Sequence, residues 1–122
     1  MNGSAWDGTY EEEWTEGQPT PILPVRALVM GDLNCTAASH EYAVFCGERT
    51  DKGVRLTPAD GLIDLWVAAG HGELEGRSFL KDGTKIDHIL GTPDMADLVS
   101  RAWIDEQAAG SDHQPLFVEL RR

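Results

Sequence analysis

The run VRALVMGDLN at residues 25–34 is the most informative part of this 122-residue chain. Its first six residues are mostly apolar and predict a buried strand, which the glycine ends. Asp32 and Asn34 follow two residues apart, and on an extended chain this spacing places both side chains on one face. A carboxylate beside an amide suits a site where water attacks phosphorus. Asp32 would orient or deprotonate the water, or hold a metal through it, and Asn34 would donate to a phosphoryl oxygen. An Asp-x-Asn pair after a strand is also typical of an ordinary turn.

A second motif, KIDHIL at residues 85–90, lies in a run that alternates from Thr84 onward and predicts another strand. Asp87 is a carboxylate within otherwise apolar surroundings, which is costly unless the group is paired. His113 is the candidate partner, because a carboxylate bound to one ring nitrogen fixes the tautomer and favours the imidazolium. That imidazolium would stabilise negative charge developing on a phosphoryl group. The alternative is an exposed strand carboxylate with no such partner.

The third motif is SDHQP at residues 111–115, just before a final predicted strand. The proline biases Gln114 toward extended geometry, so the neighbouring side chains Asp112 and His113 can diverge. One of them can then face a metal and the other a substrate. Asp112 offers hard oxygen, which suits magnesium or manganese. Taken alone, the motif also fits a polar turn.

Composition limits the classes of partner. The formal net charge is -11, which argues against a protein that grips duplex DNA through its backbone but does not exclude a phosphate substrate. Cys35 and Cys46 are expected to be free and partly buried rather than paired. Met1 is followed by polar, acidic residues, and no apolar run approaches the ~20 residues of a membrane span. If the chain is complete, we expect a soluble, cytoplasmic protein; a longer form could carry an export signal.

The remaining sequence predicts one small domain. Residues 1–24 are acidic and rich in proline and glycine, and are expected to be irregular, either as a surface loop or as an arm that contacts a partner. Trp66 is expected in the core, with stacking on a substrate ring as the alternative. The other expected elements are a helix capped by Ser39 with Tyr42, Phe45 and Cys46 on its apolar side, a polar loop at 47–58, a helix at 61–69, a short strand at 77–80, a helical turn at 93–98, and strands at 99–104 and 115–120.

Taken together, the three motifs are similar to those of a known family. Residues from about 25 to 120 resemble the C-terminal half of the endonuclease/exonuclease/phosphatase superfamily, which includes deoxyribonuclease I, apurinic endonucleases, sphingomyelinases and inositol polyphosphate 5-phosphatases. Residues 31–34 match its G-D-[FL]-N motif, residues 86–90 its I-D-[YH]-[IV]-L motif, and residues 111–115 its S-D-H-x-P motif. The stretches D-G-L-I-D-L-W and S-F also resemble the family.

The resemblance implies a fold, a chemistry and a set of site residues. Residues 25–122 would form an α/β (α+β) structure, the C-terminal half of a four-layer α/β/β/α sandwich, with one mostly antiparallel sheet and helices on one face. Asp32 would activate or position the nucleophilic water, Asn34 would contact the scissile phosphate, and Asp87 would orient His113. His113 would contact the phosphate in the transition state. Asp112 would lie at the metal site, with Mg²⁺ or Mn²⁺ as the cofactor.

The chain also departs from the family pattern. The first half of the family fold carries an Asn and a Glu that anchor the metal and a further catalytic His, and nothing upstream of Val25 resembles these motifs. Residues 11–13 are three glutamates, but they lie too close to Gly31 to replace the family Glu, and no histidine precedes His40. We therefore expect a truncated product, a gene fragment or one part of a split protein.

The prediction is accordingly a divalent-metal phosphoester hydrolase that acts on a small, lipid or nucleic-acid substrate. As an isolated chain it should be inactive until the missing N-terminal half is supplied. The alternatives are a non-catalytic half-domain that serves as an interaction module, or a homodimer in which two copies rebuild the sandwich. In the isolated chain we expect the strands at 25–30, 84–90 and 115–120 to expose an apolar face.

Overall fold

The computed structural model describes residues 26–122, and the acidic segment expected at 1–24 lies outside the described residues. The class is α+β, with antiparallel sheets and few helices, as the sequence predicts. Within residues 26–122 the strands form three small antiparallel sheets rather than the one expected. No helix in the described part of the chain combines the length and apolar character needed to cross a membrane.

The central sheet has three strands in the order β2-β6-β5. β2 (Leu28–Asp32) pairs along its whole length with β6 (Asp87–Gly91), and β5 (Ile63–Asp64) pairs with the end of β6. The register places Asp32 directly opposite Asp87. Directly opposed residues of an antiparallel pair share one face, so both carboxylates project from the same side of the sheet. The two predicted strands exist, each displaced by a few residues toward the C-terminus.

Helix α2 (His40–Cys46) covers the other face of this sheet. Ser39 is its N-cap, and the Ser39 hydroxyl accepts a hydrogen bond from the Tyr42 backbone N–H, so the predicted cap is confirmed. The helix buries Tyr42 and Cys46 in a core cluster with Leu90 of β6. Cys46 and Cys35 are both buried and unpaired, as expected.

A short ribbon follows α2, where the sequence suggested only a loop. β3 (Glu48–Arg49) pairs with β4 (Arg55–Leu56). The Arg55 guanidinium fixes this ribbon by donating twice to the Glu73 carboxylate, at 2.7 and 3.0 Å. It also donates to the carbonyls of Gly47 and Ala37. Such long-range anchoring is not visible in local sequence, which explains why the ribbon was not expected.

Helix α3 (Leu65–Ala68) is shorter than the helix expected at 61–69. Residues 63–64 are taken up by β5, and the Asp64 carboxylate caps the helix by accepting from the Trp66 N–H at 3.0 Å. Trp66 is buried, as the core interpretation expected. The strand expected at 77–80 is reduced to single bridges from Phe79 to Thr84 and to His113.

The C-terminal part forms a hairpin. After the turn of helix α4 (Pro93–Ala96), β7 (Val99–Ile104) pairs with β8 (Leu116–Leu120). Both strands lie close to their predicted bounds. Trp103 was expected to be packed, but it is 37% exposed and stacks on Phe117 across the hairpin, with ring centroids 5.3 Å apart.

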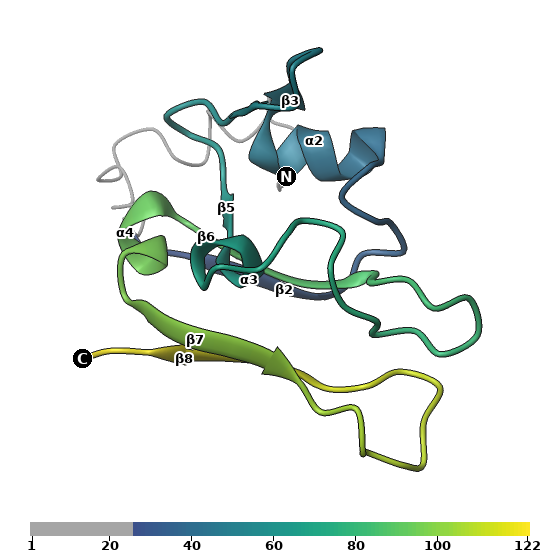
Figure 1. Ribbon diagram of the computed structural model, residues 1–122. Coiled ribbons are helices and arrows are strands. Elements are labelled where there is room, and N and C mark those ends of the chain that lie inside the picture. Colours follow the sequence, from purple (N-terminus) through teal and green to yellow (C-terminus); the bar gives the residue numbers. More distant parts are fainter. Residues whose placement is uncertain (1–25) are drawn as a thin grey trace, which may run out of the picture.

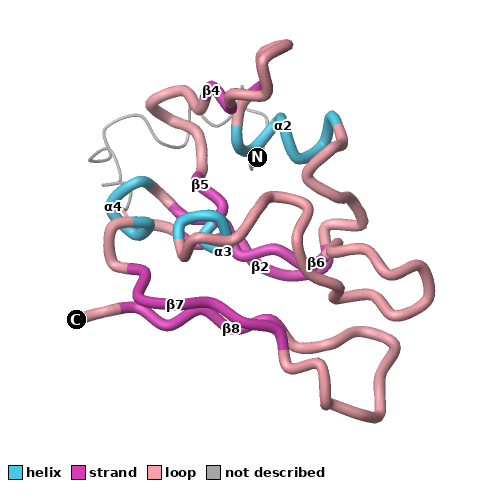
Figure 2. Tube along the Cα trace, viewed as in Figure 1, coloured by secondary structure: helices cyan, strands magenta, loops and turns pink. Residues whose placement is uncertain are grey.

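These parts form layers, as Figures 1 and 2 show. α2 lies on one side of the β2-β6 pair and the β7-β8 hairpin on the other. β8 contacts β6, and α3 contacts both β6 and β7. The side of the sheet that carries the two opposed carboxylates therefore faces the hairpin, and the loop that leads into β8 approaches them.

Candidate active site

Three residues that are far apart in the sequence converge at one end of the central sheet. Asp32 ends β2, Asp87 begins β6, and His113 lies in the loop that enters β8. Their candidate ligand atoms all lie within 4.8 Å of one another. Directly opposed like charges on a sheet are destabilising, so a cation is needed between Asp32 and Asp87. The imidazole of His113 occupies this position.

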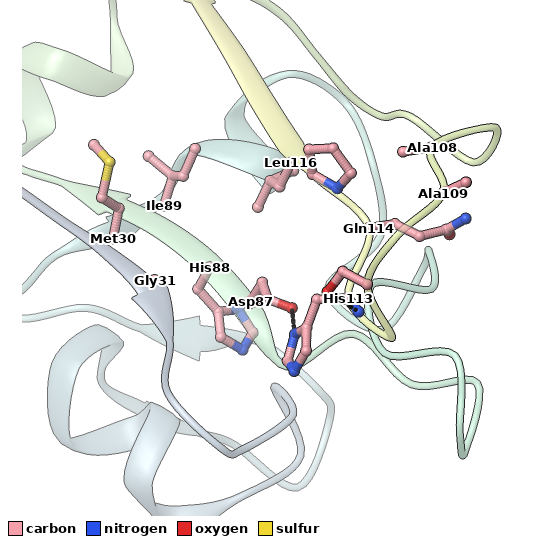
Figure 3. Close-up of a pocket in the computed structure, with 12 residues that line it drawn as sticks. Met30, Gly31, Asp87, His88, Ile89, Ala108, Ala109, His113, Gln114 and Leu116 are labelled. Atoms are coloured by element: carbon pink, nitrogen blue, oxygen red, sulfur yellow. Dashed lines mark hydrogen bonds and ion pairs between the residues drawn. The ribbon is translucent and has the colours of Figure 1, made fainter.

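His113 makes the contact with Asp87 that the sequence predicted. Its Nδ1–H donates to Asp87 Oδ2 at 2.8 Å, and Figure 3 shows the two side chains pointing toward each other. The other ring nitrogen, Nε2, lies 3.6 Å from Asp32 Oδ2. The hydrogen bond to Asp87, aided by the charges of Asp87, Asp32 and Asp112, raises the pKa of His113 above its usual value despite partial desolvation. The arrangement therefore favours the imidazolium.

Asn34 leaves the strand through a sharp turn. Its φ of 54° is in the left-handed region, which asparagine tolerates better than most residues. The Asp32 Oδ1 atom accepts a hydrogen bond from the Asn34 backbone N–H at 2.8 Å, which closes the turn. The motif is thus both a turn, as the simpler interpretation held, and part of the convergent cluster. Within residues 26–122 the side-chain amide of Asn34 makes no hydrogen bond, so it is available to a ligand.

Asp112 is placed differently from the other predicted residues. Its side chain is exposed, and its backbone carbonyl accepts a hydrogen bond from the Leu80 N–H at 2.8 Å. Its carboxylate is close enough to raise the pKa of His113 but does not belong to the convergent ligand atoms. Its role at a metal site stays a prediction.

The donor chemistry fits a hard divalent cation. Mg²⁺ is usually bound by one or two carboxylates together with water and substrate oxygens, and Asp32 and Asp87 offer two carboxylates here. One oxygen of each is already engaged, Asp32 Oδ1 with Asn34 and Asp87 Oδ2 with His113. Of the remaining oxygens, Asp32 Oδ2 already lies 3.6 Å from His113 Nε2, so a cation would share this oxygen with the imidazole. Together with Asp87 it makes only a partial coordination sphere, so a tightly held ion needs further ligands.

A pocket of about 430 Å³ opens beside Asp87 and His113. It lies between the central sheet and the hairpin, because Met30 of β2 and Leu116 of β8 both line it (Figure 3). Most of its wall is apolar, and the Asp87–His113 pair lies at one end. The cluster is therefore reachable from outside rather than sealed in the core.

A scan against protein-family models matches residues 7–113 to the Endonuclease/Exonuclease/phosphatase family. The chain belongs to this family. The match contains the first two motifs and ends at His113 of the third, and it extends upstream into the segment outside the described residues. Membership in the endonuclease/exonuclease/phosphatase family indicates phosphoester hydrolysis, typically with a divalent metal. No curated protein matches the chain.

Sequence reasoning missed three buried polar residues that support the cluster. The Ser78 hydroxyl accepts from the backbone N–H groups of Ile86 and Asp87, at 3.0 and 3.1 Å, and so fixes the start of β6. The Ser78 carbonyl accepts from the Gln114 N–H at 2.7 Å, which anchors the loop that carries His113. The other two are Lys85 and His88, both buried within the second motif. The available signal was the presence of two basic residues in a motif whose other residues, apart from Asp87, are apolar.

Proposed function

We propose that this cluster is part of the active site of a divalent-metal-dependent phosphoester hydrolase. The observation that supports the proposal is the convergence of Asp32, Asp87 and His113 beside an open pocket, in a chain of this family. Asp32 accepts the proton of the attacking water as the bond from its oxygen to phosphorus forms. His113, held as the imidazolium by Asp87, faces the phosphoryl oxygens and stabilises their growing negative charge.

The other predicted residues complete this scheme. Asn34 donates its side-chain amide to a phosphoryl oxygen. The bond from phosphorus to the leaving group then breaks, and the leaving group departs as an alcohol after taking a proton from solvent. A bound Mg²⁺ or Mn²⁺ would supply Lewis-acid polarisation of the phosphoryl group. Asp32 would hold it beside Asp87, and the exposed Asp112 carboxylate, which lies outside the convergent ligand atoms, would have to turn toward it to serve as the predicted further ligand.

We further propose that the isolated chain is an incomplete enzyme. Among the described residues only two carboxylates converge, whereas the family anchors its metal mainly with an Asn and a Glu from the first half of the fold. Those ligands would come from an N-terminal half of the family fold, whereas a second copy of the chain would cover the sheet without supplying them. The substrate class, whether small, lipid or nucleic acid, stays open, and the net charge of -11 favours the smaller or lipid phosphoesters.

The test combines metal binding and hydrolysis. Mn²⁺ added to the ¹⁵N-labelled chain should broaden the resonances of residues around Asp32 and His113 selectively, and Asp32→Asn should abolish this broadening.

Bis-nitrophenyl phosphate hydrolysis should be negligible for the chain alone. It should appear when a protein half that carries the family's Asn, Glu and His motifs is added, and it should be lost again with His113→Gln. Broadening spread evenly over the acidic surface would contradict the metal site. Activity of the chain alone that is lost in Asp32→Ala would contradict its incompleteness.

A second candidate function, a non-catalytic interaction module, is favoured by one observation. Leu28 and Met30 are exposed on β2, next to the cluster. A partner covering them would also cover the pocket. If such a module is the function, complementation should yield a complex without hydrolysis, and Mn²⁺ should leave the spectrum of the cluster unchanged.

A further inference from the structure

The second motif contains a buried lysine that the proposed chemistry does not use. Lys85 is only 3% exposed, and no carboxylate within residues 26–122 forms a salt bridge with it. Burying an ammonium group without an ion-pair partner is costly, so its hydrogen bonds must compensate. Its Nζ atom donates to the backbone carbonyl of Asp87 at 2.9 Å and lies 3.3 Å from His88 Nδ1. Both contacts are with β6, at the residue that orients His113 and at its neighbour.

These contacts determine the tautomer of His88. An ammonium group has no acceptor, so Nδ1 of His88 must accept from Lys85 and carries no proton. The other nitrogen, Nε2, lies 2.7 Å from the carbonyl oxygen of Cys35, which can only accept. Nε2 therefore carries the proton and donates to Cys35. The imidazole of His88, itself 1% exposed, joins the ammonium of Lys85 to that carbonyl.

The carbonyl that receives this bond belongs to the first motif. Cys35 directly follows Asn34, whose left-handed φ carries the chain away from β2. The regular pairing of β2 with β6 ends at Asp32 and Asp87, and one more bond follows it, from the Leu33 N–H to the Ile86 carbonyl at 3.1 Å. Beyond Leu33, the Asn34–Cys35 segment is held by the hydrogen bond from His88 Nε2 to the Cys35 carbonyl. His88 lies on the face of the sheet opposite to Asp87.

We propose that Lys85 and His88 are positioning residues for the active site. They tie the Asn34–Cys35 segment to β6 and so hold Asp32, just before it, opposite Asp87 and His113 in a fixed arrangement. Both side chains are buried, and the role we assign to them is to position other residues, although His88 also borders the pocket. This role rests on the proposed function of the cluster, but its geometry can be tested without any catalytic assay.

The test uses the metal-free 122-residue chain labelled with ¹⁵N. In the wild type, His88 should be the neutral tautomer with the proton on Nε2, as read from its imidazole ¹⁵N shifts. Lys85→Met keeps the aliphatic stem and removes the donor. It should make the backbone amides of Leu33 and Asn34 exchange about tenfold faster, the effect expected for loss of roughly one hydrogen bond. The amide of Trp103 in the β7-β8 hairpin should not change, because a local loss of positioning leaves the distant hairpin intact.

Matched variants separate positioning from general destabilisation. Lys81→Met removes the same charge from an exposed site and should leave exchange unchanged. Lys85→Arg should restore slow exchange because it keeps a donor. His88→Gln should stay closer to the wild type than His88→Phe, since the Gln side chain can still donate to Cys35. Should His88→Phe not fold, the comparison of Lys85→Met with Lys85→Arg decides through the same amides.

Two results would overturn the proposal. One is a proton on Nδ1 of His88 in the wild type. The other is an increase in exchange at Leu33 and Asn34 no larger than at Trp103. Because no metal or substrate is present, a failed hydrolysis assay would count against the proposed function alone, and a failed exchange experiment against the positioning role alone.

Discussion

His113 lies between two carboxylates that come from different strands, so its protonation is tied to the folded state. In the unfolded chain the imidazole has its ordinary pKa, and in the folded protein the hydrogen bond to Asp87 raises it. The stabilisation from this contact is therefore fully present below the unfolded-state pKa of about 6.5, and it is lost as pH rises through the higher folded-state pKa. This pH dependence of stability is opposite in sign to that of a salt-bridged carboxylate, whose contribution is lost as the pH falls.

We predict that Asp87→Asn lowers the pKa of His113 in metal-free buffer, because the charged acceptor is removed while the side-chain shape is kept. A titration followed by NMR of the histidine ring measures this. In the wild type, the free energy of unfolding measured in urea should fall as the pH rises through the His113 pKa. In Asp87→Asn this fall should be absent.

The control for this prediction is Asp51→Asn, at an exposed turn residue between β3 and β4. It should leave the pKa of His113 where it is. An equal shift in both variants would mean that general surface charge, rather than the contact with Asp87, raises the pKa.

At the scale of elements, the β3-β4 ribbon depends on one side chain. Arg55 and Glu73 are largely buried, with side chains 14% and 20% exposed, whereas Arg49, which reaches the same carboxylate at 3.7 Å, is 44% exposed. We predict that Arg55→Met lowers the free energy of unfolding by about 3 kcal/mol, because it leaves a buried carboxylate and two carbonyls without their partner. Denaturant unfolding measures this loss.

Arg49→Met is the matched control, since it removes the same charge from the same carboxylate at a solvated position. Its expected cost is below about 1 kcal/mol. If the two variants cost the same, burial of the Arg55–Glu73 pair is not what fixes the ribbon.

Elements with a local signal were predictable from the sequence. Ser39 caps α2 as expected, and the strand expected at 99–104 forms β7 between the same residues. The helix expected at 61–69 was wrong in its first half. There, Ile63 and Asp64 pair with β6, and this tertiary pairing outweighs helical periodicity.

The candidate site also has contacts that could be predicted from the sequence and contacts that could not. The contact between Asp87 and His113 was predictable, because a carboxylate in an apolar strand needs a partner and the third motif supplies one. The hydrogen bonds of Ser78 and His88 were not, since they depend on which backbone atoms the fold brings near them. A sequence pattern identifies a side chain that needs a partner more readily than it identifies the distant partner.

At the scale of the whole molecule, the exposed side chains of β2 matter most. Leu28 is 39% and Met30 59% exposed, and within the described residues β2 is an edge strand of the central sheet. Each large apolar side chain left in water forgoes roughly 1.5–3 kcal/mol of burial. An exposed edge strand also offers unpaired backbone groups to another chain.

We therefore predict that the isolated chain self-associates or binds an apolar dye. Sedimentation velocity should show species heavier than the monomer, and the double substitution Leu28→Thr with Met30→Thr should reduce both association and dye fluorescence. Val44→Thr, at a 69% exposed position on α2, should not. A stable monomer with cooperative unfolding and no dye binding would contradict this prediction and the half-domain interpretation with it.

The layered position of the cluster also bears on how the chain folds. Asp87 and His113 are separated by 26 residues in the sequence, and Asp32 lies farther away still. Contacts between distant residues require loop closure before they return any energy, so they form late. The hairpin must pack on the central sheet before His113 can meet either carboxylate. We therefore expect a partly folded chain to contain the three side chains but not the site they form.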